Sequence, residues 1–137
     1  MSASPITGGC LCGALRYEAV AEPVYAGLCY CTDCRKASGS GFAPFMGFKA
    51  EHLTITGETR QSRVPSFSGG TATRNHCAQC GGMVFGGVYG ESDEHTIYAG
   101  SLDDASRFQP KMALFTRDRP DWAEVKAELT EFETMPH

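Results

Sequence analysis

Apolar residues in this chain recur in short alternating runs rather than in long amphipathic stripes. One clear run is Leu53-Thr54-Ile55-Thr56, which is followed at once by Gly57. Because side chains of a strand alternate between two faces, this pattern indicates a half-buried strand. Similar runs predict strands over residues 11–19, 41–49, 53–56, 62–67, 71–76, 83–88 and 95–99. Closely spaced strands separated by turn residues are typical of an antiparallel all-β fold.

Two segments predict short helices. Residues 32–38 begin at a capping Thr or Asp and end before Gly39, which is a common helix stop. Residues 121–132 place Trp122 and three later apolar residues on a roughly helical stripe. The same segment could instead lie as an irregular tail over the sheet. We therefore expect an all-β fold with one or two short helices.

The length and net charge of the chain limit the classes of protein to which it can belong. A chain of 137 residues has the length of one domain, which we expect to span residues 1–137. Its first residues lack the basic and apolar regions of a signal peptide, and no stretch is apolar enough to cross a bilayer. We expect a soluble, cytoplasmic protein without a membrane partner. The net charge of −4 argues against a nucleic-acid partner, which would require clustered Lys and Arg. The sequence does not specify an oligomeric state.

The core is expected to be thin, because Gly and Pro together are almost as common as Leu, Ile, Val and Phe. A loop-rich chain that still folds generally needs disulfides or metals. The seven cysteines could supply either. A reducing cytoplasm disfavours disulfides, and an odd number of cysteines leaves one thiol over in any disulfide scheme. Metal binding is therefore the favoured interpretation.

All seven cysteines fall into clusters. These are Cys10-Leu11-Cys12, Cys29-Tyr30-Cys31-Thr32-Asp33-Cys34 and Cys77-Ala78-Gln79-Cys80. If Cys10 and Cys12 lie in a strand, their side chains share a face and could offer two sulfurs to one ion. A Cys-x-x-Cys turn also converges two sulfurs, and two such pairs make a structural Cys₄ zinc site. Three protein ligands with an open fourth position are typical of a catalytic zinc.

Spacing alone leaves the pairing of the clusters open. The first and last clusters could share one ion, which leaves the middle cluster to hold a second. The two Cys-x-Cys pairs, at residues 10–12 and 29–31, could equally share an ion and leave Cys34 to join Cys77 and Cys80. Both arrangements predict two zinc ions in the chain.

The cysteine pattern resembles that of the glutathione-dependent formaldehyde-activating family, which also includes centromere protein V. The likeness rests on Gly9-Cys10-Leu11-Cys12-Gly13, on Cys29-x-Cys31-x-x-Cys34-Arg35 and on Cys77-x-x-Cys80-Gly81, and continues through Tyr98-Ala99-Gly100-Ser101-Leu102-Asp103-Asp104. It implies a structural zinc on Cys10, Cys12, Cys77 and Cys80 and a catalytic zinc on Cys29, Cys31 and Cys34. It also implies a β-tent of small antiparallel sheets joined over the two metals.

The three-ligand site suggests thiol chemistry. Three thiolates on Zn²⁺ leave a net charge of −1, which suits a soft fourth ligand such as an incoming thiol. The resemblance then implies a zinc-dependent carbon–sulfur lyase or synthase, acting on adducts of glutathione or a similar thiol with formaldehyde or another aldehyde. The alternatives are a non-catalytic carrier of glutathione or another thiol, and a zinc-stabilised interaction module.

A few polar residues are further candidates for substrate contacts. Arg35 and Lys36 follow the middle cluster and could attract an anionic thiol, or could simply face solvent. Arg74 could bind an anion or pair with a nearby carboxylate. His76 could support a ligand, although a surface or strand position is the better expectation. Adjacent Asp103 and Asp104 are expected to lie in a turn or to cap a helix.

Overall fold

The computed structural model describes residues 4–136, and strands dominate it. The smaller sheet has three antiparallel strands, in the order β1 (Ile6–Gly9), β2 (Arg16–Ala19) and β5 (Leu53–Thr56). The larger sheet has eight strands, in the order β11 (Thr130–Glu131), β10 (Met112–Leu114), β3 (Tyr25–Cys29), β4 (Ala43–Lys49), β9 (Glu94–Tyr98), β8 (Met83–Gly86), β7 (Thr71–Cys77) and β6 (Thr59–Pro65). The predicted all-β class is confirmed.

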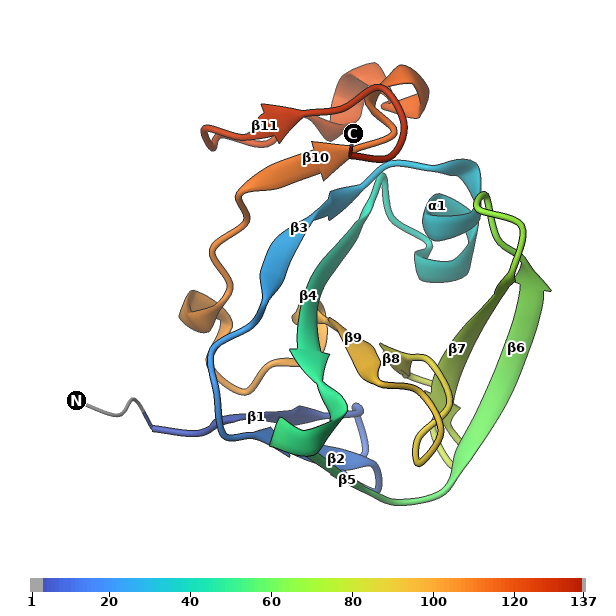
Figure 1. The fold of residues 1–137 in the computed structure, drawn as a ribbon, viewed down its shortest axis with the longest axis vertical. Helices are drawn as coiled ribbons and strands as arrows, with labels where there is room; N and C mark the ends of the chain where they lie inside the picture. The colour runs from blue at the N-terminus through green and yellow to red at the C-terminus, as the bar shows by residue number, and fades with distance from the viewer. Residues whose placement is uncertain (1–3, 137) are drawn as a thin grey trace.

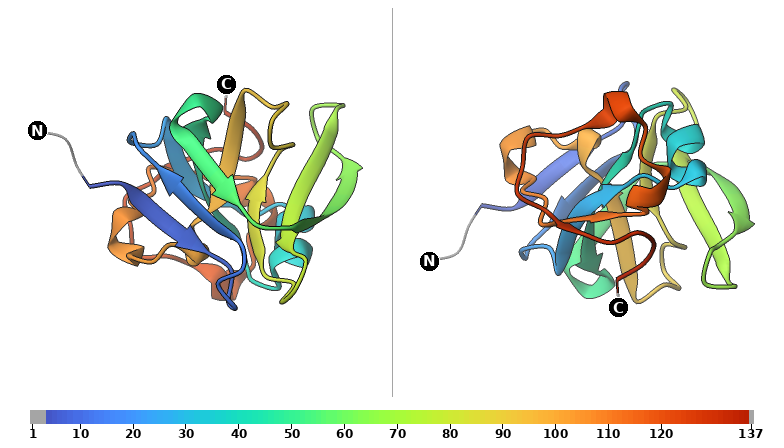
Figure 2. Two further views of the ribbon diagram at one scale, coloured as in Figure 1. Left: turned by 90° about the horizontal axis from the view of Figure 1, so that it is seen from below. Right: turned by 90° about the horizontal axis from the view of Figure 1, so that it is seen from above.

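The larger sheet is strongly curved, so its two ends approach one another around α1 (Thr32–Ser38) (Figure 1). The three-stranded sheet lies at the opposite end of the molecule from β10 and β11. Views from above and below show the C-terminal segment crossing one end of the curved sheet (Figure 2). No helix among residues 4–136 is long and apolar enough to cross a membrane.

The main hydrophobic core fills the space between the two sheets. The three-stranded sheet contributes Ile6, Tyr17 and Ile55, and the larger sheet contributes Met46 and Ile97. Alternation along β9 sends Ile97 into this core and leaves Thr96 and Tyr98 on the other face. That other face of the larger sheet carries the pockets described below.

Some sequence predictions of the elements were wrong. Residues 11–15 form a turn rather than the start of a strand, and the side chain of Leu11 is 94% exposed. Residues 121–132 contain only a single 3₁₀ turn, Asp121–Ala123, and the two-residue β11, so the irregular-tail alternative is the correct one. The sheets are also not wholly antiparallel, because β10 runs parallel to β3 and to β11.

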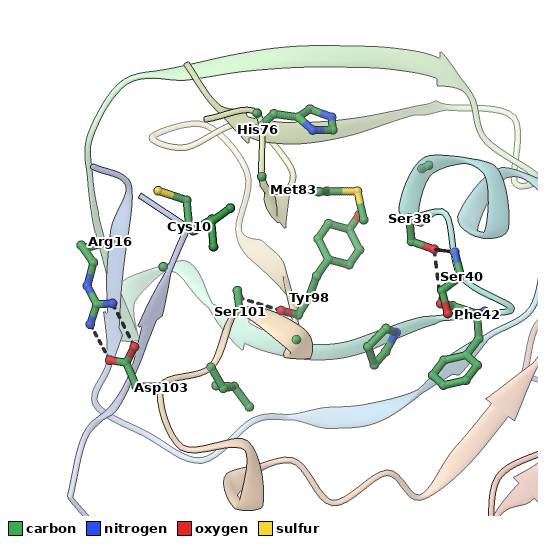
Figure 3. A pocket seen from close by; sticks show the side chains of 18 residues that line it. Cys10, Arg16, Ser38, Ser40, Phe42, His76, Met83, Tyr98, Ser101 and Asp103 are labelled. Atoms are coloured by element: carbon green, nitrogen blue, oxygen red, sulfur yellow. Dashed lines mark hydrogen bonds and ion pairs between the residues drawn. The ribbon is translucent and has the colours of Figure 1, made fainter. Parts of the chain in front are cut away.

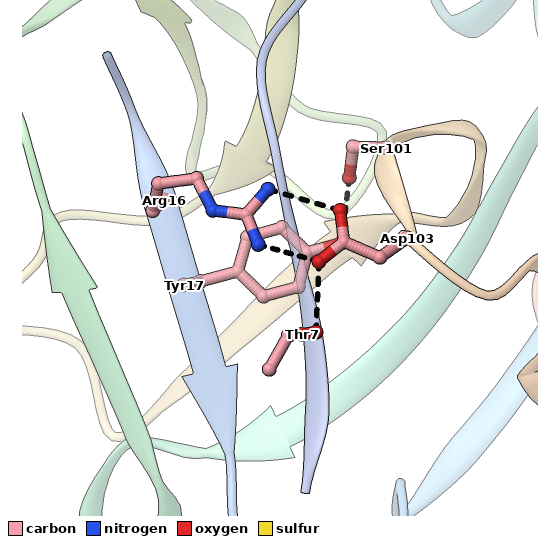
Figure 4. Close-up of polar contacts among 5 residues, drawn as sticks. All are labelled: Thr7, Arg16, Tyr17, Ser101 and Asp103. Atoms are coloured by element: carbon pink, nitrogen blue, oxygen red, sulfur yellow. Dashed lines mark hydrogen bonds and ion pairs between the residues drawn. The ribbon is translucent and has the colours of Figure 1, made fainter. Parts of the chain in front are cut away.

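A polar cluster joins the three-stranded sheet to the segment after β9. The Arg16 guanidinium, on β2, forms two hydrogen bonds with the Asp103 carboxylate, one of them 2.9 Å long, and the Thr7 hydroxyl donates a third at 2.8 Å (Figure 4). Hydrogen bonds from Arg16 and then Thr7 lower the pKa of Asp103 to about 2. The predicted capping role holds for Asp104, which accepts from the Ser106 amide, whereas Asp103 forms an ion pair.

The lowered pKa of Asp103 predicts a pH-dependent contribution to stability. Because the folded pKa lies below the ordinary value of about 3.9, the ionised form is stabilised by folding. This contribution is complete above about pH 4 and is lost as the pH falls toward about 2. We expect Asp103→Asn to lower the urea midpoint slightly at pH 7, with a constant difference from wild type down to about pH 4. Arg16→Gln should remove the same contribution. A difference in urea midpoint between wild type and Asp103→Asn that grows as the pH falls would contradict the prediction.

Candidate metal centres and adjoining pockets

Four cysteines from distant parts of the chain meet at one point, and we call them the four-cysteine cluster: Cys10, Cys12, Cys77 and Cys80. Cys10 and Cys12 lie in the turn between β1 and β2, Cys77 is the last residue of β7, and Cys80 lies in the turn that follows it. The Sγ atoms of Cys10 and Cys12 are 3.6 Å apart, and those of Cys12 and Cys77 are 3.7 Å apart. Tetrahedral zinc with bonds of about 2.3 Å requires sulfurs about 3.8 Å apart, so the cluster fits such an ion.

In each half of the four-cysteine cluster, Cys10 with Cys12 and Cys77 with Cys80, the two sulfurs converge because the chain turns there. Alternation of side chains along a strand is not the cause. The expectation that Cys10 and Cys12 share a strand face was wrong, since both lie beyond the end of β1. Gly13 follows Cys12 and Gly81 follows Cys80, with positive φ angles of 85° and 79°, a conformation that glycine adopts without strain. Backbone amides then point at the sulfurs: Leu15 donates to Cys10, and Cys80 donates to Cys77. Such donors stabilise thiolates.

The remaining cysteines form a local group, the three-cysteine cluster of Cys29, Cys31 and Cys34, whose sulfurs all lie within 4.8 Å of one another. Cys29 ends β3, Cys31 caps the N-terminus of α1, and Cys34 lies in its first turn. The Cys31 sulfur accepts a hydrogen bond of 3.3 Å from the Cys34 amide. The predicted helix over residues 32–38 is thus confirmed, with Cys31 rather than Thr or Asp as its cap.

Crowding of the three thiols separates their acidities. Hydrogen bonds from the side chains of Cys29 and Cys34 lower the pKa of Cys31, whereas contacts with Cys31 and Cys34 raise the pKa of Cys29. Cys31 is therefore the first of the three thiols to lose its proton, and its negative charge would repel a second or third thiolate at this distance. A bound cation removes that repulsion, so the donor set fits a metal as well as the four-cysteine cluster does.

A pocket of about 440 Å³ lies beside the three-cysteine cluster, and Cys29 and Cys34 form part of its wall. The rest of the wall comes from the face of the large sheet opposite the core and from the C-terminal segment: Tyr25, Ala43, Phe45, Thr96, Tyr98, Met112, Leu114, Met135 and Pro136. We call this the apolar pocket. Among residues 4–136, none of those that line it is an Asp, Glu, Lys, Arg or His.

Arg74 lies next to the same cluster and is only 8% exposed. Its Nη2 atom is 3.9 Å from the Cys34 sulfur, and its Nε atom is buried without a hydrogen-bond partner. Within residues 4–136, no carboxylate forms an ion pair with it, so the predicted alternative of a carboxylate partner is wrong for this part of the chain. A buried guanidinium with an unpaired donor destabilises the folded state unless an anion pairs with it.

Tyr98 stands beside Arg74 and was not singled out by the sequence. Its side chain lines the apolar pocket together with Thr96, and both also line a second, smaller pocket that contains Arg74. Burial raises the pKa of Tyr98 to about 12, so its hydroxyl stays protonated at neutral pH and can donate a hydrogen bond. The pairing that creates this site joins β7, β8 and β9, with Arg74 opposite Gly86 and Gly86 opposite Thr96.

A third and larger pocket, of about 820 Å³, lies between the four-cysteine cluster and α1 (Figure 3). Tyr98 stands in its middle, with Cys10, Arg16 and Asp103 at one end and Ser38 and Ser40 at the other. Tyr98 therefore borders all three pockets. The Ser38 hydroxyl donates to the Cys34 carbonyl at 2.7 Å, which ties this end of α1 to the three-cysteine cluster.

The other candidates have smaller roles in the geometry. His76 is in neither cysteine cluster; it lines the large pocket and lies 3.4 Å from the Ser62 hydroxyl. Arg35 and Lys36 do not line the apolar pocket, and Lys36 is exposed. Gly39 ends α1 in the left-handed conformation, in keeping with a helix stop.

Comparisons with known proteins identify a family and relatives that the chain resembles. A family model described as glutathione-dependent formaldehyde-activating enzyme matches residues 5–118. A protein of Halomonas elongata, provisionally named a glutathione-dependent formaldehyde-activating enzyme, is 28% identical over 130 residues, covering 89% of this chain and 82% of the relative. The crystal structure of a Rhodobacter sphaeroides protein superimposes with a TM-score of 0.53 at 20% identity, covering 71% of this chain and 87% of that one. The last likeness concerns the fold alone.

Proposed function

Because the chain belongs to the glutathione-dependent formaldehyde-activating family, we propose that it is a zinc-dependent carbon–sulfur lyase or synthase. It makes or splits adducts of glutathione, or a similar thiol, with formaldehyde or another aldehyde. It acts as a single domain in the cytoplasm. The observation that carries the proposal is the three-cysteine cluster, which offers three sulfurs beside a pocket large enough for a substrate.

The two clusters have different roles in this proposal. Cys10, Cys12, Cys77 and Cys80 hold a structural zinc that links two distant turns. Cys29, Cys31 and Cys34 hold a second zinc at the reaction site. When bound there, zinc would act as a Lewis acid that favours the thiolate form of a substrate thiol.

The residues around the cluster position the aldehyde. In the synthetic direction, a carbon–sulfur bond forms, the carbonyl double bond becomes single, and the proton lost by the thiol ends on the former carbonyl oxygen. Negative charge grows on that oxygen during the step. The Arg74 guanidinium and the protonated Tyr98 hydroxyl are the donors placed to hold it, because both lie beside Cys34. The apolar wall limits access of competing water.

Metal content tests the assignment of ligands. Wild-type protein should carry about two zinc ions per chain, and Cys31→Ser should carry about one, because it removes a ligand from the three-cysteine cluster only. Glutathione should bind to wild type with a millimolar or tighter affinity and should not bind at the emptied site. Elemental analysis and calorimetry provide these measurements. If the Cys31→Ser variant binds as much zinc as wild type and binds glutathione with the same affinity, the assignment is refuted.

Catalysis requires a separate comparison, because thiols add to formaldehyde without a catalyst. Exchange between free and glutathione-bound ¹³C-formaldehyde, followed by NMR, gives the rate in both directions. We expect wild type to accelerate the exchange and Cys31→Ser to return it to the rate without protein. If wild type binds glutathione yet leaves the exchange rate unchanged, the alternative function of a thiol carrier is correct.

A further inference from the structure

The apolar pocket is much larger than the carbon unit of formaldehyde needs. In the adduct of a thiol with formaldehyde, only one carbon and one oxygen follow the sulfur. The oxygen already has donors in Arg74 and Tyr98 under the proposed function. A pocket of about 440 Å³ lies beside Cys29 and Cys34, within the usual range of small-molecule sites. Most of this volume would stay empty with formaldehyde as the aldehyde.

The chemistry of the wall decides what could fill that volume. Phe45, Met112 and Leu114 line the pocket together with the ring of Tyr25. A glutathione-like thiol carries two carboxylates and an ammonium group. None of these charges would find an oppositely charged side chain among the lining residues within the described range 4–136, so burying them against this wall would be unfavourable. The peptide part of such a thiol must therefore lie outside this pocket, and an apolar group remains as the fitting occupant.

We infer that the apolar pocket binds the hydrocarbon substituent of the aldehyde, so that the substrates are thiol adducts of aldehydes with an alkyl or aryl chain. This inference rests on the proposed function, because it places the adduct's sulfur at the three-cysteine cluster. The carbon that joins sulfur, oxygen and substituent then lies between Cys34, Arg74 and the apolar wall. Formaldehyde becomes the smallest member of the substrate class rather than its typical one.

The direct test uses unreactive thioether analogues of the adducts: S-methyl-, S-propyl- and S-hexylglutathione. Calorimetry with the zinc-loaded wild type should give a Kd that falls about threefold to fourfold for each methylene group entering the pocket. Met112→Trp and Leu114→Phe each add bulk to the pocket wall from β10. Both variants should make the Kd nearly independent of chain length, and S-methylglutathione should bind as it does to wild type. Val20→Trp adds similar bulk at an exposed position outside the pocket and should behave as wild type.

The outcomes separate this inference from the proposed function. A wild-type Kd that does not improve from methyl to hexyl, or no binding of any analogue, overturns the inference. Accelerated exchange of the formaldehyde adduct would still support the proposed function in that case. Conversely, a chain-length dependence that both pocket-filling variants abolish supports the pocket even if no exchange is catalysed. If only one variant folds, as judged by its circular dichroism and melting transition, that variant alone decides the result.

Discussion

Cys80→Ser should unfold the protein, whereas Cys34→Ser should leave a folded chain with one metal site lost. Each substitution replaces the sulfur of one partly exposed cysteine by oxygen. The difference lies in what each cluster joins. The four-cysteine cluster bridges Cys12 and Cys77, which are 65 residues apart, and so ties the small sheet to β7 and β8. The three-cysteine cluster lies within one six-residue segment.

The expected magnitude follows from the energetics of zinc sites. Structural zinc contributes apparent binding free energies of about 10–16 kcal/mol, and a domain is typically stable by only about 5–15 kcal/mol. Loss of one ligand from the long-range cluster is therefore enough to remove the folded state. Loss of Cys34 gives up a local site while the sheets keep their hydrogen bonds and core.

Circular dichroism and the urea midpoint, measured with stoichiometric zinc, check this prediction. Cys80→Ser should lack the cooperative transition of wild type, and Cys34→Ser should retain one with about one zinc per chain. Adding a chelator to Cys34→Ser should then unfold it, because only the structural ion remains. Equal loss of stability in both variants would contradict the division of the two clusters into structural and catalytic roles.

The cysteine clusters could be predicted from sequence because their members are close together along the chain. Spacing indicated zinc and left two pairings open, and the structure groups the sulfurs as the family resemblance implied. The strands with clear alternation, such as Leu53–Thr56, were also found. In contrast, β1 (Ile6–Gly9) has two glycines and a short apolar signal, and β10 and β11 have only three and two residues. Pairing with neighbours, rather than local propensity, makes these segments strands.

The residues beside the three-cysteine cluster could not be identified in this way. Arg74 reaches Cys34 only because β7, β8 and β9 pair with Arg74 opposite Gly86 and Gly86 opposite Thr96, and because the sheet curves back toward α1. A slip of one residue would turn Arg74 to the opposite face, and no short sequence pattern specifies that register. Tyr98 lay within the segment that supported the family resemblance, yet its position at the junction of three pockets depends on the same long-range pairing.

Arg74 is expected to matter for the reaction more than for the fold. If its guanidinium holds the charge that develops on the aldehyde oxygen, the contact is strongest in the transition state. Arg74→Gln should then lower kcat by about 10²–10³, the usual effect of removing one such donor, with little change in KM. Arg74→Lys keeps the positive charge but loses the planar set of donors, so it should recover only part of the rate.

The competing explanation is that Arg74 only balances the net negative charge of three thiolates and a zinc ion. Zinc content distinguishes the two roles. If Arg74 only balances charge, Arg74→Gln should lose the second zinc ion to the same extent as it loses kcat. Arg74→Lys, which keeps the positive charge, should then restore both the zinc content and kcat. If Arg74 holds the oxygen, Arg74→Gln should keep about two zinc ions per chain while its kcat is low. Arg60→Gln, which removes an exposed arginine from β6, is the matched control and should leave both zinc content and kcat unchanged.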